Sequence, residues 1–234
     1  MTETSEALPT RIRVLGVDPG TRTLGYGVLD VAPRGKLDVV ECGVVRLPPK
    51  PLEVRLEAIF RDVGEIILRR EPDVLAIEDV FGGKNFRSTL KVGEARGVVV
   101  LAAQRSGLKI CEYAPAFVKR AATGNGAADK RQVQKAMVRL LRLPSAPEPT
   151  DVTDALAVAF CHARGLWRPG PNGAPRGGAA AGSRRGAEAR PHRASRPRAA
   201  AIPKEKLREI LRGSRPRAFV GRRFRRSGRG GEGA

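Results

Sequence analysis

The chain has 234 residues and a formal net charge of +20, with 44 Lys and Arg against 24 Asp and Glu. Its three cysteines, Cys42, Cys111 and Cys161, form no Cys-x-x-Cys pair, which argues against a zinc site or a disulfide framework and fits a reducing compartment. The first residues lack the apolar core of a signal peptide, and the longest apolar stretch, Val98 to Ala103, is far too short to span a bilayer. We therefore expect a cytoplasmic protein without a membrane anchor.

The composition divides the chain near residue 165. Residues 165–234 hold 19 Lys and Arg against 4 Asp and Glu, so they carry +15 of the total charge. We predict a disordered N-terminus at 1–10, one domain over 11–166, and a basic, mostly disordered tail over 167–234. Within the tail, Leu207, Ile210 and Leu211 share one side of a predicted short helix at 203–212. A basic disordered tail is typical of proteins that bind a polyanion, above all nucleic acid.

The first half of the domain begins with three predicted strands, at 12–17, 23–31 and 37–47, which we expect to form an antiparallel meander. The tight Pro19-Gly20 turn joins the first two. Apolar residues at helical spacing then predict a helix over 52–70. They are Leu52, Leu56, Ile59, Val63, Ile66 and Ile67.

Pro72 marks the end of that helix, and residues 74–78 form the fourth predicted strand. Because a helix separates it from the third strand, the fourth strand is expected to pair parallel to the first. A Gly-rich loop at 79–87 follows, and Ser88 is expected to cap a helix running to about 105. Residues 108–114 give a fifth strand.

Two basic helices are predicted near 115–121 and 129–143, and a linker from Pro144 to Pro149 follows them. Thr150 is expected to cap the last core helix, which runs to about 164. This order predicts a mixed α/β fold: a five-stranded sheet, with three antiparallel strands and then parallel crossovers, and helices on both faces.

Four acidic residues stand in contexts that this topology brings together. Asp18 and Glu78 each end an apolar strand, and Asp151 and Asp154 lie three apart at the start of the last core helix. Each has an ordinary explanation alone: a turn residue, a solvated strand end, or acids that favour a helix N-terminus. Together they predict a metal site, because the strand ends and one helix face meet at the same sheet edge.

The residue types at that site indicate the chemistry. Oxygen-only ligands select hard cations such as Mg²⁺ or Mn²⁺. Four carboxylates balance two divalent ions, and two ions about 3.5–4 Å apart are the arrangement that supports phosphodiester cleavage. A basic protein with such a site is most simply a nuclease.

Four motifs, in collinear order over residues 11–164, resemble the RuvC family of Holliday-junction resolvases. They are Gly16-Val-Asp-Pro-Gly-Thr-Arg22, Ala76-Ile-Glu-Asp-Val-Phe81, Leu90-Lys-Val-Gly-Glu-Ala-Arg-Gly97 and Asp151-x-x-Asp-Ala-Leu-Ala157. The resemblance implies a ribonuclease-H-like fold and a homodimer that nicks two opposed strands of a four-way junction, leaving 5′-phosphate and 3′-hydroxyl ends. It also implies a partnership with the RuvA–RuvB branch-migration complex.

The resemblance further assigns roles to single residues. It implies that Asp18, Glu78, Asp151 and Asp154 are catalytic ligands of Mg²⁺, two ions per subunit, with Mn²⁺ as a substitute. It implies that Phe81 stacks on or wedges against a junction base, whereas a packed residue anchoring the loop is the alternative.

Basic residues supply the predicted contacts with DNA. By resemblance, Lys119 and Lys130 lie near the scissile phosphate. The helix at 129–143 has a basic face opposite an apolar one, and three basic residues lie near the Gly-rich loop, so a phosphate-binding groove is predicted. The basic face holds Arg131, Lys135, Arg139 and Arg142, the apolar face Val133, Met137, Leu140 and Leu141, and the loop region Lys84, Arg87 and Lys91.

The helix predicted at 88–105 contains Gly93, Ala95 and Gly97, although Gly costs about 1 kcal/mol in a helix interior. Close packing would explain them, either in a two-fold subunit interface or against the sheet of the same subunit. Phe86 is expected in packing or in an interface.

Three other functions compete with junction resolution. Asp18-Pro-Gly-Thr also resembles the phosphate loop of actin-like and sugar-kinase ATPases, but the core is too short for their two lobes. A non-catalytic nucleic-acid binder leaves the four acids unexplained. A ribonuclease acting on structured RNA is the second candidate, because fold alone does not determine substrate. The Phe81 loop and the Leu90–Gly97 motif favour junction DNA.

Overall fold

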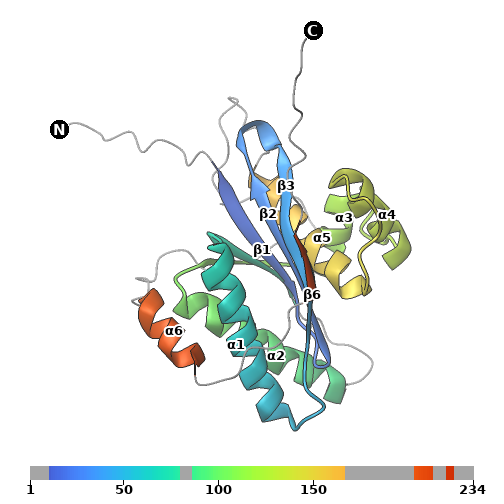
Figure 1. Cartoon of the computed structure of the whole chain (residues 1–234). Coiled ribbons are helices and arrows are strands. Elements are labelled where there is room, and N and C mark those ends of the chain that lie inside the picture. Colours follow the sequence, from blue (N-terminus) through green and yellow to red (C-terminus); the bar gives the residue numbers. More distant parts are fainter. Residues whose placement is uncertain (1–10, 80–85, 167–202, 213–219, 224–234) are drawn as a thin grey trace, which may run out of the picture.

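The strands form one mixed sheet. The computed structural model describes residues 11–79, 86–166, 203–212 and 220–223 (Figure 1). All five predicted strands are present, within one residue of the predicted bounds. They are β1 (Ile12–Asp18), β2 (Thr23–Val31), β3 (Leu37–Arg46), β4 (Val74–Glu78) and β5 (Lys109–Tyr113). A short 3-10 turn, Pro33–Gly35, lies between β2 and β3.

The sheet order is β5-β4-β1-β2-β3-β6. The antiparallel meander of β1, β2 and β3 and the parallel pairing of β4 with β1 are confirmed. A sixth strand, β6 (Val220–Arg223), pairs antiparallel with β3 and was not predicted. It has only four residues and no alternation of apolar and polar side chains, so sequence periodicity could not reveal it.

The helices are α1 (Leu52–Arg70), α2 (Phe86–Arg105), α3 (Pro115–Thr123), α4 (Lys130–Leu140), α5 (Thr150–Leu166) and α6 (Lys204–Arg212). Three predicted boundaries were wrong. Thr150 is the first residue of α5 rather than its cap. Ser88 lies inside the first turn of α2 rather than at its cap. Helix α4 ends at Leu140, before the predicted 143, and Arg142 beyond it adopts a left-handed φ of 52°, which does not continue a right-handed helix.

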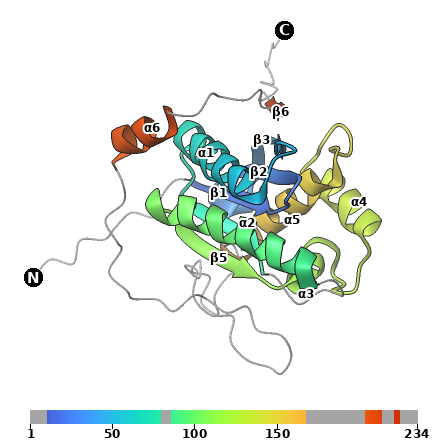
Figure 2. The same ribbon diagram turned by 90° about the horizontal axis from the view of Figure 1, so that it is seen from below.

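Helices cover both faces of the sheet, as predicted. Helices α1 and α2 lie on one face, and α3, α4 and α5 lie on the other (Figures 1 and 2). Successive residues of β1 divide between the two hydrophobic cores: Val14 packs with the α5 side, and Leu15 packs with the α1 and α2 side. Because side chains alternate along a strand, the uncharged run from Val14 to Val17 in β1 fits a sheet that is buried on both faces.

Helix α5 packs unusually close to the sheet. A Cβ atom added at Gly16 would lie 2.2 Å from the carbonyl oxygen of Ala155, and one added at Gly25 would lie 2.0 Å from that of Asp151. Only glycine allows backbones to approach this closely. These two glycines therefore bring the first turns of α5 directly beside the end of β1.

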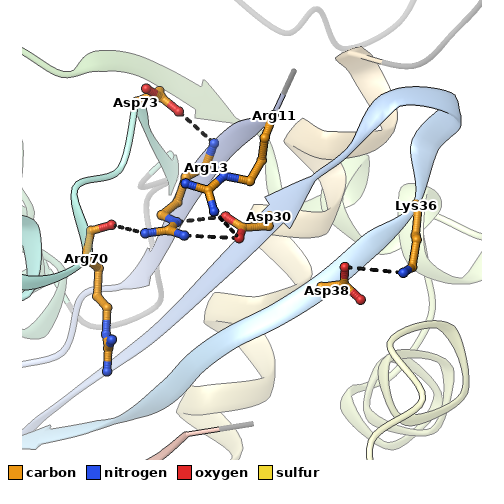
Figure 3. A network of polar contacts seen from close by, with 7 residues as sticks. All are labelled: Arg11, Arg13, Asp30, Lys36, Asp38, Arg70 and Asp73. Atoms are coloured by element: carbon orange, nitrogen blue, oxygen red, sulfur yellow. Dashed lines mark hydrogen bonds and ion pairs between the residues drawn. The ribbon is translucent and has the colours of Figure 1, made fainter. Parts of the chain in front are cut away.

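The sheet end opposite Asp18 is held by a network of charged groups (Figure 3). The guanidinium of Arg13 donates to Asp30 at 2.7 Å and to the carbonyl oxygen of Arg70 at 2.6 Å. The backbone N–H of Arg13 donates to Asp73 at 2.7 Å, and Arg11 adds a second ion pair to Asp30. The network joins β1, β2, the end of α1 and the start of β4.

A buried carboxylate extends this pattern. Glu41 in β3 is buried and accepts hydrogen bonds from the Tyr26 hydroxyl at 2.6 Å, from Arg69 at 2.8 Å and from Arg70. Burial alone would raise its pKa, but the Tyr26 hydrogen bond and the two arginines lower the pKa of Glu41 below its ordinary value. The charge is fully compensated inside the fold.

Helix α6 packs on α1. Leu207 and Leu211 are buried, and the Leu211 side chain lies against Gly64. At the other end of α6, Lys204 Nζ lies 2.5 Å from Glu71 Oε1. The predictions of disorder for 1–10 and for most of 167–234 fall outside the described residues.

One face of α2 is open. Phe86, Leu90 and Leu101 expose 77%, 53% and 51% of their surface. Cβ atoms added at Gly93 and Gly97 would meet no atom of the described residues within 4 Å. Packing of these glycines against the sheet of the same subunit was therefore a wrong explanation, and so was intramolecular packing for Phe86.

All three cysteines are free, in line with the sequence prediction. Among the helices in the described ranges, none combines the length and the apolar character that crossing a membrane requires.

Candidate metal centre

Three of the four predicted carboxylates meet at one edge of the sheet. Asp18, Asp151 and Asp154 each offer an oxygen atom, and these atoms all lie within 4.8 Å of one another. Asp18 is the last residue of β1, and the two other aspartates occupy the first turns of α5, one above the other. Residues far apart in the sequence thus form one compact acidic group.

Glu78 lies beside this group rather than within it. It is the last residue of β4, and the register of Val17 opposite Ile77 places it next to Asp18 at the same sheet edge. The charges of Asp154 and Glu78 influence each other strongly enough to shift the pKa of Glu78 upward, after the larger effect of burial. The fourth carboxylate therefore lies at the rim of the acidic group, near enough for the charge of Asp154 to act on it.

The electrostatics indicate a site that needs positive charge. Burial first, and then the negative charges of Asp154, Glu78 and Asp151, raise the pKa of Asp18 to about 7. Repelling carboxylates resist full ionisation unless a cation lies between them. An oxygen-only donor set of this kind fits a hard divalent ion such as Mg²⁺ or Mn²⁺.

Thr23 is a site residue that the sequence reasoning missed. Its hydroxyl donates to Asp151 Oδ2 at 2.6 Å and so fixes the orientation of that carboxylate. Partners that orient ligands in this way contribute to metal affinity. Thr23 directly follows the Gly16–Arg22 motif, but no local pattern predicts that a neutral residue at a strand start lies opposite α5.

Lys119 and Lys130 both lie near the acidic group. Lys130 Nζ, at the start of α4, lies 3.0 Å from Asp154 Oδ2, and its pKa is raised by that hydrogen bond. Lys119 lies on α3. Its positive charge partly offsets the upward shift in the pKa of Glu78. The two lysines line the side of the site that α3 and α4 form.

The remaining predicted DNA contacts divide into two sets. On α4, Arg131 and Lys135 are exposed, opposite the buried Val133 and Met137. The predicted apolar face was wrong at Leu140, which is partly exposed where the helix ends.

Arg87 and Lys91 are exposed on α2, which lies on the opposite face of the sheet from α4. The described basic residues of α2 and α4 therefore come from opposite faces of the sheet. Phe81 and Lys84 lie outside the described residues.

Known proteins match the same part of the chain. A profile of the family described as "Crossover junction endodeoxyribonuclease RuvC" matches residues 14–162. The protein of that name from Pelotomaculum thermopropionicum is 49% identical over 151 residues, covering 64% of this chain and 92% of its relative. The one from Koribacter versatilis is 46% identical over 152 residues, covering 64% and 92%.

Solved structures agree with these matches. Thermus thermophilus RuvC is 36% identical with a TM-score of 0.60, covering 65% of this chain and 93% of that one. The same protein in complex with a Holliday-junction substrate gives a TM-score of 0.61 with the same coverage. Both confirm the ribonuclease-H-like fold, and each of the four matches covers 64–65% of this chain.

Proposed function

Because this chain belongs to the RuvC family of crossover junction endodeoxyribonucleases, we propose that it resolves four-way DNA junctions by metal-dependent, symmetric nicking during recombination and repair. The observation that carries the proposal is the group of Asp18, Asp151 and Asp154 oxygens within 4.8 Å of one another in a chain of net charge +20. Acids repel DNA phosphates, so an acidic group at the centre of a basic protein is useful to a nuclease only with a bound cation.

The four carboxylates are the proposed ligands. Asp18, Asp151 and Asp154 would hold one Mg²⁺, with Glu78 at the rim completing the site for a second, and Mn²⁺ would substitute. When bound, such ions activate water and stabilise the leaving oxygen, leaving 5′-phosphate and 3′-hydroxyl ends. Thr23 keeps the Asp151 carboxylate in one orientation through its 2.6 Å hydrogen bond.

Basic side chains bind and orient the DNA in this proposal. Lys119 and Lys130 border the acidic group and would contact the phosphate next to the cleaved bond. Lys130 is paired with Asp154 at 3.0 Å, and a cation in the site would compete for that carboxylate and free the lysine for DNA. Arg131 and Lys135 would hold one arm of the junction along α4.

The α2 side of the sheet offers further contacts. Arg87 and Lys91 are exposed there and would bind the backbone of the junction. Phe81 and Lys84 are proposed to contact the DNA near the junction centre, with the Phe81 ring stacking on a base.

The open face of α2 supports a homodimer. Phe86, Leu90 and Leu101 recur at helical spacing around Gly93 and Gly97, where a second helix could approach closely. A two-fold interface uses the same patch on both subunits, so one such face is sufficient. A dimer also matches the symmetry of a four-way junction, which would place two cuts in equivalent strands.

Two further inferences rest on family membership alone. The chain would act in the cytoplasm, and the RuvA–RuvB branch-migration complex would be its partner. Pull-down of RuvA and RuvB by the full chain on a four-way junction would test the second inference, and failure to retain either protein would contradict it.

Cleavage of a synthetic four-way DNA junction tests the proposed function. Linear duplex and an RNA–DNA hybrid serve as controls, in Mg²⁺ and then with EDTA. We expect paired symmetric nicks on the junction alone, lost with EDTA and in a folded Asp154→Asn variant. Cutting of the hybrid alone would overturn the proposal in favour of a ribonuclease.

Sedimentation of the Leu90→Asp variant tests the dimer. A charge in the centre of the α2 face should shift the wild-type dimer to monomer. Leu140→Asp, a matched change at another exposed leucine, should leave the dimer intact. Dimers of equal stability in both variants would place the interface elsewhere.

A further inference from the structure

Arg96 lies in the Leu90–Gly97 motif, and neither the metal site nor the DNA contacts described above give this residue a role. Only 17% of its side chain is exposed. Its Nε donates to the carbonyl oxygen of Glu78 at 3.2 Å, and its Nη2 lies 2.7 Å from Glu112 Oε1 and 3.8 Å from Asp79 Oδ1. One guanidinium therefore joins α2 to the end of β4 and to β5.

The contact falls on the peptide group that follows the rim carboxylate. That peptide group contains the carbonyl of Glu78 and the N–H of Asp79. Arg96 binds the carbonyl, and the N–H donates to the carbonyl oxygen of Tyr113 at 2.9 Å. Because a peptide group is planar, holding it at both sides fixes its plane. The plane in turn fixes the backbone at Glu78, from which the carboxylate extends.

Arginine suits this position for a physical reason. Its planar guanidinium presents several N–H groups in fixed directions and stays charged at all relevant pH values. The ion pair with Glu112 holds the guanidinium while Nε reaches the Glu78 carbonyl. A lysine could make either contact but not both in the same geometry.

The same helix presents the open apolar face to solvent. Ala95 is buried toward the sheet, and Gly97 faces open space, so Arg96 lies between the two sides of α2. A shift of α2 would move the guanidinium and, with it, the peptide group after Glu78. The position of the proposed subunit interface is thus mechanically connected to the rim of the metal site.

We propose that Arg96 is a positioning residue that holds the Glu78–Asp79 peptide group, keeps the Glu78 carboxylate directed at the metal site, and couples this site to the α2 face. The inference rests on the proposed function, since it concerns how one of the proposed ligands is placed. It adds a role for α2 inside each subunit, distinct from contact with the second subunit.

Junction cleavage by the full-length Arg96→Ala variant tests the inference. Removing a partner that orients a ligand typically costs about 10–100-fold in activity or metal affinity. We expect kcat to fall by about that factor and the Mg²⁺ concentration for half-maximal cleavage to rise, with KM for the junction unchanged. Calorimetry with Mn²⁺ and no DNA should show the weaker metal binding directly.

Two control variants separate a positioning role of Arg96 from a general loss of folded structure. Arg105→Ala makes the same change at an exposed residue at the far end of α2 and should leave kcat and metal dependence unchanged. Arg96→Lys keeps the charge but cannot make both contacts, and it should lose about tenfold in kcat with KM unchanged. If Arg96→Ala does not fold, Arg96→Lys decides the question.

The outcomes distinguish this inference from the proposed function. A wild-type chain that leaves the junction intact in Mg²⁺ would contradict the proposed function. Wild-type cleavage together with unchanged kcat, Mg²⁺ dependence and Mn²⁺ affinity in Arg96→Ala, or in Arg96→Lys if that variant decides, would overturn the role of Arg96 alone. A rise in KM with unchanged kcat would also overturn it, because that pattern indicates a lost DNA contact.

Discussion

At the end of the sheet where Asp18 lies, carboxylates face one another, whereas Asp30 at the other end and Glu41 near the middle of β3 face arginines. Burial and neighbouring acids raise the pKa of Asp18 to about 7. Arg69, Arg70 and the Tyr26 hydroxyl offset burial at Glu41 and lower its pKa. The same sheet therefore holds negative charge in two opposite ways, one uncompensated and one compensated within the fold.

This difference separates function from stability. Buried charges that are paired and hydrogen-bonded hold elements together, and removing one partner is strongly destabilising. Clustered like charges reduce stability, and proteins tolerate them where activity requires them. We infer that the Asp18 end is arranged for a metal and DNA, and that the Arg13–Asp30 and Glu41 contacts maintain the fold around it.

Asp18→Asn should have the largest effect. Removal of a proposed ligand should lower junction cleavage by about a thousand-fold or more, equivalent to roughly 4 kcal/mol of transition-state stabilisation. The metal-free variant should nevertheless be more stable than wild type at neutral and alkaline pH, because one repelling charge is gone. Cleavage rates and thermal melting with EDTA measure the two effects.

The stability that Asp18→Asn gains over wild type should depend on pH, because the pKa of Asp18 is raised. In the unfolded chain the carboxyl ionises near 3.8, and in the folded chain near 7, so the folded state is penalised increasingly as pH rises through this window. The stability difference between Asp18→Asn and wild type should be small below this window and full above it. A difference that does not change with pH would contradict the assignment.

Glu41→Gln should have the next largest effect, and on stability alone. Loss of a buried carboxylate leaves Arg69 and Arg70 without their compensating charge, and we expect a loss of about 3 kcal/mol. Because the folded-state pKa of Glu41 is lowered, its contribution exists above about 4.5 and disappears as pH falls further. Urea unfolding at several pH values measures this, and cleavage below the melting temperature should be unchanged.

Leu207→Ala should have a smaller effect on stability than Glu41→Gln. The side chain is buried between α6 and α1, so its removal should destabilise the chain by about 2 kcal/mol. Arg208→Ala, at the exposed neighbouring position, is the matched control and should have little effect. Equal stability of the two variants would mean that α6 does not pack on α1 in solution.

Lys36→Ala should have the smallest effect. Lys36 Nζ lies 3.7 Å from Asp38 Oδ2, and the lysine side chain is 67% exposed (Figure 3). Such surface pairs contribute about 0–1 kcal/mol. A loss of stability as large as that of Glu41→Gln would contradict the view that this exposed ion pair contributes little to the fold.

Much of the fold could be predicted because β1, β4 and α1 carry strong apolar patterns. The metal site could be predicted because Asp18, Glu78 and the Asp151–Asp154 pair each lie at the end of such an element. Thr23 and Arg96 could not, since both act through contacts with residues distant in sequence that no local pattern records.

Two other features depend on surroundings that the sequence does not contain. The spacing of Gly93 and Gly97 indicates that a side chain is absent, but not whether protein or open space lies beyond it. Strand β6 depends on the free edge of β3 rather than on its own four residues.

The contact between Thr23 and Asp151 spans 128 positions of the chain. During synthesis, all five strands of the core are made before α5, so a chain still growing on the ribosome holds Asp18 and Glu78 without the two remaining acids. Contacts of such long range form late, because the intervening segment must be ordered first. The proposed metal site is thus completed by the last core helix, so an unfinished chain lacks two of the four proposed ligands.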